Sequence, residues 1–135
     1  MRVRRVKVLL DTHTFLWWSL EPRKLPSFLL KVLQEPENQI FLSTVSSWET
    51  QIKRGLGKIT LYEPLKDIIQ REITLNNWEV LPVMLHHTWE LDRLPPLHRD
   101  PFDRLLIAQA LAENLTIATK DSFICQYPEI ELIWE

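Results

Sequence analysis

Apolar positions recur along the chain with two different periods. Short apolar runs bounded by polar or turn residues predict buried strands, and apolar residues repeated every three to four positions predict helices. Strands are expected at residues 6–10, 39–43, 79–83, 115–119 and 130–134, and helices at 14–20, 27–33, 44–55, 65–75, 85–94 and 105–112. Pro82 indicates that the third strand lies at a sheet edge, because proline donates no backbone hydrogen bond.

The order of these elements predicts the fold class. Strands that alternate with helices favour parallel pairing through right-handed crossovers, with helices covering both faces of the sheet. No linker or internal repeat interrupts the pattern. We therefore expect a single domain over residues 1–135, an α/β/α sandwich around a sheet of five strands.

Composition narrows the classes of function. The chain has 135 residues, 45% of them hydrophobic, and only 2 glycines, and neither the dinucleotide-binding nor the P-loop glycine motif is present. Cys125 is the single cysteine, which excludes an internal disulfide and a cysteine-based metal cluster and is typical of a reducing cytoplasm. The apolar runs are too short to span a bilayer, so no membrane association is expected.

Four acidic residues stand where the expected elements would bring them to one edge of the sheet. Asp11 directly follows the first strand, and Asp121 lies just beyond the fourth. Glu49 lies early in the helix after the second strand, and Asp103 begins the helix before the fourth. Clustered carboxylates repel one another unless a cation offsets their charge. Oxygen ligands without thiolates favour Mg²⁺ or Mn²⁺, which can orient a water for attack on a phosphodiester.

Four motifs carry a resemblance to a known family: DTHTFLWW, STVSSWE, LPPLHRDPFDRLLIAQA and LTIATKD. In this order and spacing they resemble PIN-domain ribonucleases, and most closely the VapC-type toxins of bacterial toxin–antitoxin pairs. The resemblance covers essentially the whole chain. It implies an α/β/α sandwich with a mainly parallel five-stranded sheet. The four acids would bind Mg²⁺ or Mn²⁺ and act in RNA cleavage.

The resemblance also implies partners. A small antitoxin protein would insert a segment into the acidic cleft, and a homodimer is common among such proteins. The expected function is therefore a metal-dependent endoribonuclease that hydrolyses RNA phosphodiester bonds in the cytoplasm as the toxin of such a pair.

Local helix-start patterns compete with the metal assignment. Asp100 followed by Pro101 is typical of a helix N-cap, and Asp103 then falls in the first turn, where an acid also stabilises the helix dipole. This pattern alone favours capping. The resemblance instead assigns the metal to Asp103 and leaves the cap to Asp100, which can also support the site from outside the metal ligands.

Two further acids have a competing local interpretation. Ser46-x-x-Glu49 is a capping box if a helix begins at Ser46. A helix that begins nearer Ser43 instead places Glu49 one turn inside, pointing toward the strand ends. The residues leave both open, and the resemblance favours metal binding. Asp121 can equally cap a turn formed by DSFICQ.

Other residues near the acids are candidates for contacts with the acids or with substrate. Arg104 is expected to form an ion pair, with an RNA phosphate as the alternative partner. Thr119 and Ser46 are expected to support the acids or touch substrate. The basic residues after Glu49 are either solvated or a guide for an RNA backbone; they are Lys53, Arg54 and Lys58.

Aromatic residues and histidines have mainly structural interpretations. The aromatic residues are expected in the core or a protein interface more than in base stacking; they are Phe15, Trp17, Trp18, Phe28 and Trp48. The histidines lack the spacing of a zinc-binding helix and are expected to be solvated or locally bonded; they are His13, His86, His87 and His98.

Two other functions remain open. A response-regulator-like switch would bind Mg²⁺ and accept phosphate, but it needs paired acids after the first strand and an acceptor after the third. This chain has DTH and EVLPVML at those places. A catalytically silent domain would only bind an antitoxin or RNA. Retention of all four acids argues against that alternative without proving turnover.

Overall fold

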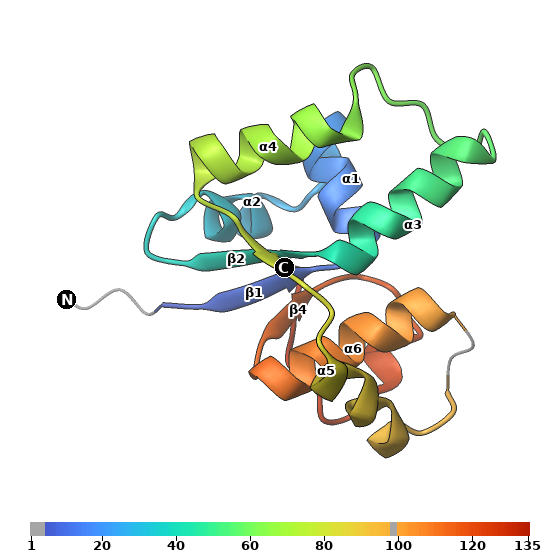
Figure 1. The fold of residues 1–135 in the computed structure, drawn as a ribbon. Helices are drawn as coiled ribbons and strands as arrows, with labels where there is room; N and C mark the ends of the chain where they lie inside the picture. The colour runs from blue at the N-terminus through green and yellow to red at the C-terminus, as the bar shows by residue number, and fades with distance from the viewer. Residues whose placement is uncertain (1–4, 98–99) are drawn as a thin grey trace.

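The computed structural model describes residues 5–97 and 100–135 and has a parallel sheet at its centre (Figure 1). β1 (Lys7–Leu10) is the middle strand, with β2 (Gln39–Ser43) and β4 (Thr116–Ala118) on either side. β3 (Glu79–Leu81) and β5 (Leu132–Ile133) form the two edges. All four pairings are parallel. The carboxyl ends of the strands therefore lie at one edge, as the alternation of strands and helices predicts.

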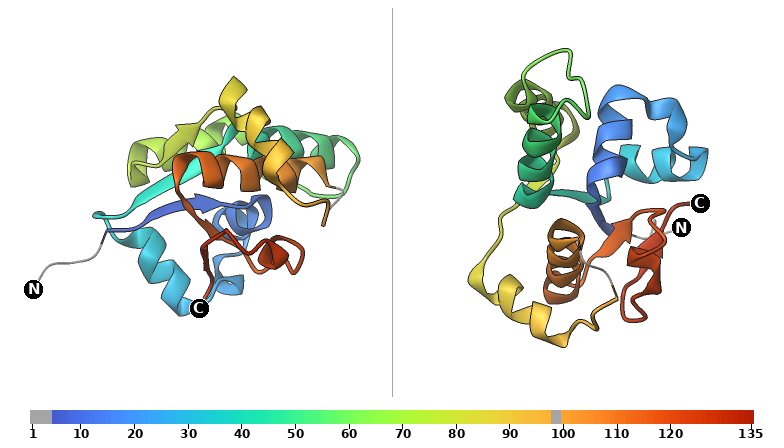
Figure 2. Two further views of the ribbon diagram at one scale, coloured as in Figure 1. Left: turned by 90° about the horizontal axis from the view of Figure 1, so that it is seen from below. Right: turned by 90° about the vertical axis from the view of Figure 1, so that its right-hand side faces the viewer.

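Helices connect the strands and cover both faces of the sheet. The α-helices are α1 (Thr12–Leu20), α2 (Ser27–Gln34), α3 (Thr44–Gly55), α4 (Leu65–Asn76), α5 (Leu85–Trp89) and α6 (Pro101–Glu113). Short 3₁₀ helices are η1 (Pro22–Lys24), η2 (Glu90–Arg93) and η3 (Ile124–Gln126). Figure 1 shows α1, α2 and α4 on one side of the strands and α5 and α6 on the other, and Figure 2 shows the same layers from two further directions. The expected α/β/α sandwich is confirmed.

The core consists of two hydrophobic clusters separated by the sheet. Side chains alternate between the faces of a strand, so Val8 and Leu10 of β1 join the cluster formed with α1, α2 and α4. Leu9 joins the cluster formed with α6 and η3. The side chains of Val8, Leu9 and Leu10 are fully buried. This explains why the strand is apolar after Lys7, and it places the residue that follows the strand, Asp11, at the end of a rigid element.

Element boundaries differ from the sequence-based expectation where caps and prolines act. The two helices expected from residues 14 and 105 begin earlier, at Thr12 and Pro101, because Asp11 and Asp100 cap them. β3 ends at Leu81, before Pro82. The helix expected over 85–94 divides into α5 and η2. Among the described helices, none is long and apolar enough to cross a membrane.

Candidate active site at the carboxyl edge of the sheet

Asp11 is held rigidly where β1 passes into α1. Its side chain is only 4% exposed and caps α1 by accepting a 2.8 Å hydrogen bond from the Thr14 N–H. The Thr119 hydroxyl donates to the second carboxylate oxygen. Burial raises the pKa of Asp11 because it disfavours the charged form, and the hydrogen bonds from Thr119 and Thr14 only partly oppose this effect. The cap therefore carries a carboxylate whose charge is poorly compensated.

Asp121 is tied to the same place through Thr119. The Thr119 hydroxyl, which donates to Asp11, also accepts a 3.0 Å hydrogen bond from the Asp121 N–H. Asp121 Oδ1 accepts from the N–H groups of Phe123 and Ile124, at 2.8 and 3.2 Å, and so caps the turn into η3. Asp121 therefore caps the turn, as one of the two interpretations predicts, and it does so through Oδ1.

Asp11 and Asp121 line a common cavity of about 230 Å³. The other lining residues are His13, Thr14, Trp17 and Lys120. The two acids are 110 residues apart in the sequence. The parallel pairing of β1 with β4 nevertheless brings the ends of the two strands together. Glu49 and Asp103 lie outside this lining.

Glu49 is linked to the Asp11 region through Thr12. The Thr12 hydroxyl donates a 2.7 Å hydrogen bond to Glu49 Oε1 and lies 3.1 Å from the Ser46 hydroxyl. The other carboxylate oxygen of Glu49 pairs with Lys53 Nζ at 3.0 Å. Because Thr12 directly follows Asp11, this contact connects the end of β1 to α3.

The start of α3 decides between the two interpretations of Glu49. Ser43 is the N-cap, and its hydroxyl accepts a 3.0 Å hydrogen bond from the Val45 N–H. The helix therefore begins at Thr44, and the alternative in which Ser46 and Glu49 form a capping box is excluded. Glu49 lies inside the helix and is 5% exposed, as the alternative with an earlier helix start predicts.

Asp100 and Asp103 divide the helix start between them. Asp100 is the N-cap of α6, with Pro101 as the first helical residue, and its Oδ1 accepts from the N–H groups of Phe102 and Asp103. The expected cap at Asp100 is confirmed. Asp103 lies half-buried in the first turn. The α3 and α6 helices also touch here, because the rings of Trp48 and Phe102 pack edge to face at 4.9 Å.

The donor types at this edge are those of a hard divalent cation. Asp11 and Asp121 supply carboxylates to one cavity, and burial of Asp11 leaves a charge that a bound cation would offset. Cys125 is the only cysteine, and partial desolvation of its thiol, together with the charges of Asp121 and Asp11, raises the pKa of the thiol and so disfavours a thiolate ligand. Carboxylate oxygens without thiolates favour Mg²⁺ or Mn²⁺.

Arg104 and Lys53 have other partners than those first expected. The Arg104 guanidinium donates to the carbonyl oxygens of Pro95 and Leu91 and to the Tyr127 hydroxyl, at 3.1 to 3.4 Å. In the described part of the chain it lies in ion-pair distance of no carboxylate. The Lys53 ammonium is engaged with Glu49 and is therefore not a free guide for an RNA backbone.

A second cluster of metal-ligand types lies at the far end of α6. His86 Nε2 and His87 Nε2 lie 2.9 and 2.8 Å from the same oxygen of Glu113, about 15 Å along the helix from Asp103. The Met84 N–H donates to His87 Nδ1 at 2.9 Å, so the His87 proton must be on Nε2, which leaves no lone pair there for a metal. Local bonding of these histidines is confirmed, whereas His98 lies outside the described residues.

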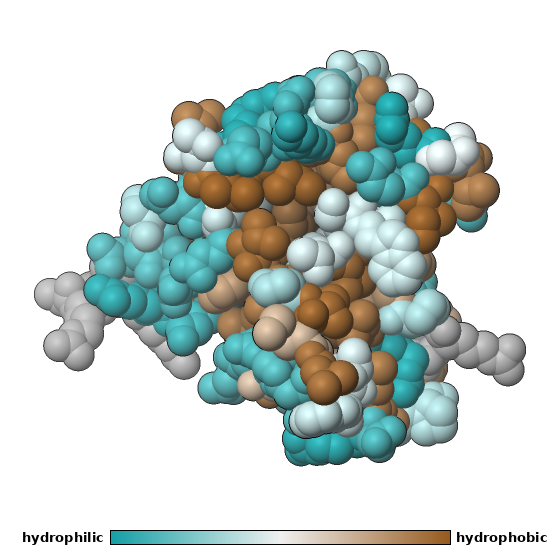
Figure 3. All heavy atoms as spheres, viewed as in Figure 1, coloured by the Kyte–Doolittle hydropathy of each residue, from teal (hydrophilic) through white to brown (hydrophobic). Residues whose placement is uncertain are grey.

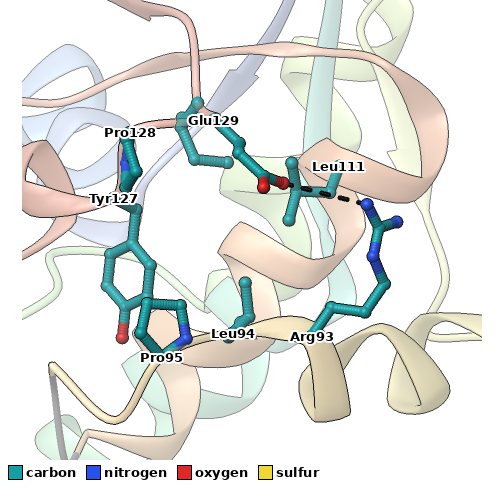
Figure 4. A pocket seen from close by; sticks show the side chains of 8 residues that line it. Arg93, Leu94, Pro95, Leu111, Tyr127, Pro128 and Glu129 are labelled. Atoms are coloured by element: carbon teal, nitrogen blue, oxygen red, sulfur yellow. Dashed lines mark ion pairs between the residues drawn. The ribbon is translucent and has the colours of Figure 1, made fainter.

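A separate cavity of about 140 Å³ lies between η2 and the segment after η3 (Figure 4). Its wall is mainly apolar, with Leu94, Leu111 and Tyr127 facing the space, and an ion pair of 3.8 Å joins Arg93 and Glu129 across it. None of the four acids lines this cavity. The one acid among its described lining residues, Glu129, pairs with Arg93, and these residues include no cluster of carboxylates, so the carboxyl edge remains the candidate active site.

Residues that the sequence did not single out as site residues complete the edge. Thr12, which follows Asp11, donates a hydrogen bond to Glu49. Lys120 lines the cavity together with His13 and Trp17. The available signal was adjacency: each of Thr12, His13 and Lys120 is within two positions of a predicted acid. Adjacency alone does not distinguish a side chain that turns toward a site from one that turns away.

Comparisons with known proteins agree with this fold. The family model of the PIN domain matches residues 8–130. A comparison with curated protein sequences finds no match. The fold is similar to a chain in the structure of VapBC2 from Rickettsia felis bound to a DNA fragment from their promoter. The TM-score is 0.71 and the identity 20%, over 96% of this chain and 100% of that chain.

Two further solved structures have a similar fold. A chain of FitAcB from Neisseria gonorrhoeae matches with TM-score 0.63 and 18% identity, over 93% of this chain and 96% of that chain. A chain of VapBC-5 from Mycobacterium tuberculosis, described as a member of the VapBC family of toxin–antitoxin systems, matches with TM-score 0.59 and 17% identity. That match covers 96% of this chain and 99% of that chain. At these identities the likeness concerns the fold.

Proposed function

The chain belongs to the PIN domain family, and we propose that it is a metal-dependent endoribonuclease that acts as the toxin of a toxin–antitoxin pair. Proteins of this family are generally nucleases, which supports hydrolysis of nucleic-acid phosphodiester bonds. The observation that carries the proposal is the shared cavity of Asp11 and Asp121 at the carboxyl edge of the sheet. The proposal takes RNA as the substrate and the cytoplasm as the location.

In this proposal the four acids together are the ligands of the bound metal. Asp11 and Asp121 hold the side of the site at β1 and β4, where Thr119 keeps both in place. Glu49 and Asp103 hold the side at α3 and α6. A bound Mg²⁺ or Mn²⁺ would supply positive charge next to the scissile phosphate and orient a water for attack.

The protein's own residues contribute preorganisation. Asp11 is kept in one rotamer by the Thr14 N–H and the Thr119 hydroxyl, and Glu49 is kept in place by Thr12 and Lys53. Carboxylates that are fixed before substrate binds lose little entropy on coordination. No side chain near the cavity needs to act as a covalent nucleophile, because an oriented water can attack the phosphorus directly.

The decisive experiment is RNA cleavage by the purified protein in Mg²⁺, Mn²⁺ or EDTA. We expect cleavage of structured RNAs with either metal and none in EDTA. Asp11→Asn and Asp103→Asn should each lower kcat/KM by about a thousandfold, since the ion supplies several kcal/mol of charge stabilisation. Asp92→Asn, an exposed acid in η2, is the matched control and should cleave like wild type. Full cleavage by Asp11→Asn would rule out the proposed site.

The antitoxin part of the proposal has separate support. One solved structure with a similar fold, VapBC-5 from Mycobacterium tuberculosis, is described as a member of a family of toxin–antitoxin systems. Hydrophobic side chains gather on the face that carries the segment from β3 to α5 (Figure 3). Large exposed apolar residues in that segment are Val80, Met84, Leu85 and Trp89. An exposed patch of this kind is typical of a protein interface, for an antitoxin or a second copy of the chain.

This part is tested by co-expressing the chain with any small protein that is encoded beside its gene. We expect a stable complex in size-exclusion chromatography and inhibition of RNA cleavage. Complex formation by a wild-type chain that never cleaves RNA would instead favour the alternative of a catalytically silent binding domain. Size-exclusion chromatography of the chain alone tests the homodimer, which a single monomeric species at all concentrations would contradict.

A further inference from the structure

Lys120 occupies a fixed position between the two parts of the candidate site. Its neighbour Thr119 donates to Asp11, and its other neighbour, Asp121, donates its N–H back to Thr119 at 3.0 Å. The backbone at Lys120 is therefore held from both sides. Lys120 also lines the cavity that Asp11 and Asp121 share. The wall of this cavity therefore contains a lysine, Lys120, and two carboxylates, Asp11 and Asp121.

The Lys120 ammonium is held by two indole rings. Nζ lies 4.9 Å from the ring centroid of Trp17 and 5.9 Å from that of Trp134, distances typical of cation–π contacts. The two rings themselves pack edge to face at 5.8 Å. Trp17 lines the cavity from α1, and Trp134 follows β5. Elements from the two ends of the chain thus converge on one ammonium group.

The contact with the rings leaves the charge of Lys120 available. An ammonium has three N–H donors, and an indole ring face accepts none of them as an oxygen would. Lys24 also approaches the Trp17 ring, at 5.8 Å, but Glu21 pairs with it at 3.4 Å. Within residues 5–97 and 100–135, no carboxylate lies at ion-pair distance from Lys120. Lys120 is therefore oriented by the rings and not neutralised by them.

We propose that Lys120 binds a phosphate oxygen of the RNA strand beside the carboxylates, and that Trp17 and Trp134 position its ammonium. The inference rests on the proposed ribonuclease function. RNA phosphates approaching Asp11 and Asp121 are repelled, and an ammonium at the cavity wall offsets part of that repulsion. A point charge with three donors suits a phosphate of any sequence. The contact is therefore expected to contribute affinity without base preference.

The test measures binding of intact RNA apart from catalysis. A fluorescein-labelled single-stranded RNA of about 12 nucleotides is titrated with protein in EDTA, and fluorescence anisotropy gives Kd over a series of NaCl concentrations. Each phosphate contact contributes about 0.7 to the slope of log Kd against log salt for single strands. Lys120→Gln should therefore lower the slope by about 0.7 and raise Kd at low salt. Lys31→Gln, which removes the same charge from an exposed residue of α2, is the matched control and should keep the wild-type slope.

Conservative variants separate a phosphate contact from a packing role. Lys120→Arg keeps both the charge and the stacking on indole and should restore most of the slope. Trp134→Leu removes one positioning ring and should weaken binding less than Lys120→Gln does. In Mg²⁺ or Mn²⁺, Lys120→Gln should raise KM more than it lowers kcat. Circular dichroism confirms that each variant is folded before its affinity is compared.

The results distinguish the failure of this inference from failure of the proposed function. If Lys120→Gln matches Lys31→Gln in slope and Kd while wild type cleaves RNA, the Lys120 inference is wrong and the nuclease proposal stands. If wild type binds RNA with the expected Lys120 effect but cleaves nothing with either metal, the contact stands and the nuclease proposal fails. The proposed contact is also wrong if the wild-type chain alone does not bind RNA. It is equally wrong if Lys120→Gln weakens RNA binding only when a partner protein is present.

Discussion

Asp11 and Glu113 are two carboxylates of one fold whose charges are balanced in opposite ways. Burial raises the pKa of Asp11, and the hydrogen bonds it accepts do not compensate. Hydrogen bonds from His86 and His87 lower the pKa of Glu113, which lies exposed at the other end of α6. The first carboxylate is costly to ionise where it stands, whereas the second is favoured in its charged form.

The difference distinguishes a candidate functional carboxylate, Asp11, from a structural one, Glu113. The contacts of Glu113 with His86 and His87 are called the clamp below. Glu113 fixes α5 to α6 with donors that the chain itself supplies, so the cluster needs nothing further to be stable. Asp11 is buried at the sheet edge without an equivalent counter-charge among its hydrogen-bond partners. Proteins keep such an unfavourable charge mainly where function requires it. Both places hold side chains of metal-ligand types, and we expect a cation to stabilise only the Asp11 cluster, which comprises Asp11 and Asp121.

The largest expected effect on stability is on the clamp. His87→Ala removes a fully buried ring, leaves the Met84 N–H without its acceptor and leaves Glu113 with His86 alone. We expect a loss of about 4 kcal/mol in the free energy of unfolding from the cavity and the unsatisfied donor. Urea denaturation followed by circular dichroism measures it. His86→Ala, the exposed neighbour, should cost far less, and equal losses in the two variants would remove the distinction between them.

The second effect concerns the Asp11 cluster and a bound ion. A ligand present at about 100 times its Kd stabilises the folded state by about 2.7 kcal/mol. Mn²⁺ should therefore raise the free energy of unfolding of wild type and of Glu113→Gln equally, and leave Asp11→Asn unchanged. The readout is thermal unfolding with Mn²⁺ and with EDTA. Stabilisation that depended on Glu113 would move the metal to the histidine cluster and contradict the comparison.

The contrast between the clusters was only partly accessible from sequence. Asp11 could be assigned to the sheet edge because an apolar strand ends directly before it, and Asp121 because it follows another such strand. Parallel strands end at one edge, so local pattern was enough. The His86, His87 and Glu113 cluster depends on how α5 packs against α6, more than twenty positions away in the chain. No local pattern reports such a contact.

Within the site, the start of a helix and the partners of a long side chain were equally hard to predict from sequence. Whether α3 begins at Ser43 or Ser46 decides if Glu49 caps or points inward, and both serines are good N-caps. The contact between Ser43 and Gln109 of α6 joins these two helices, and that tertiary hydrogen bond is invisible in sequence. Arg104 was likewise expected to pair with a carboxylate, yet its guanidinium donates to the carbonyl oxygens of Pro95 and Leu91.

A buried polar chain runs from His87 to the start of α3, the helix that carries Glu49, and Ser43 tests that connection. The Ser43 hydroxyl caps α3 and donates to Gln109 Oε1 at 2.5 Å, and Gln109 Nε2 lies 3.4 Å from His87 Nδ1. Ser43→Ala should cost about 1 kcal/mol, the usual value of a lost N-cap. It should also lower RNA cleavage modestly, because α3 carries Glu49. Ser27→Ala at the exposed start of α2 is the control, and an equal effect there would remove the special role of Ser43.

The smallest effects are those of pH, and their signs oppose each other. The pKa of Glu113 is lowered in the folded protein, so the unfolded chain binds more protons near about pH 4 and stability rises with pH there. The contribution is complete above the unfolded pKa and is lost as pH falls through the folded pKa. Glu113→Gln should therefore be less stable than wild type at neutral pH, and the difference should vanish in acid.

Asp11 gives the reverse dependence when EDTA excludes metal. Its pKa is raised by burial, so the folded protein binds the extra proton, and stability falls as pH rises from about 4, the unfolded value, through the folded pKa. Asp11→Asn keeps an acceptor for the Thr14 N–H but carries no charge. It should equal wild type in acid and exceed it in stability at neutral pH. Denaturation curves of both variants across this range test the comparison directly, because two differences of the same sign would mean that Asp11, like Glu113, is a structural carboxylate.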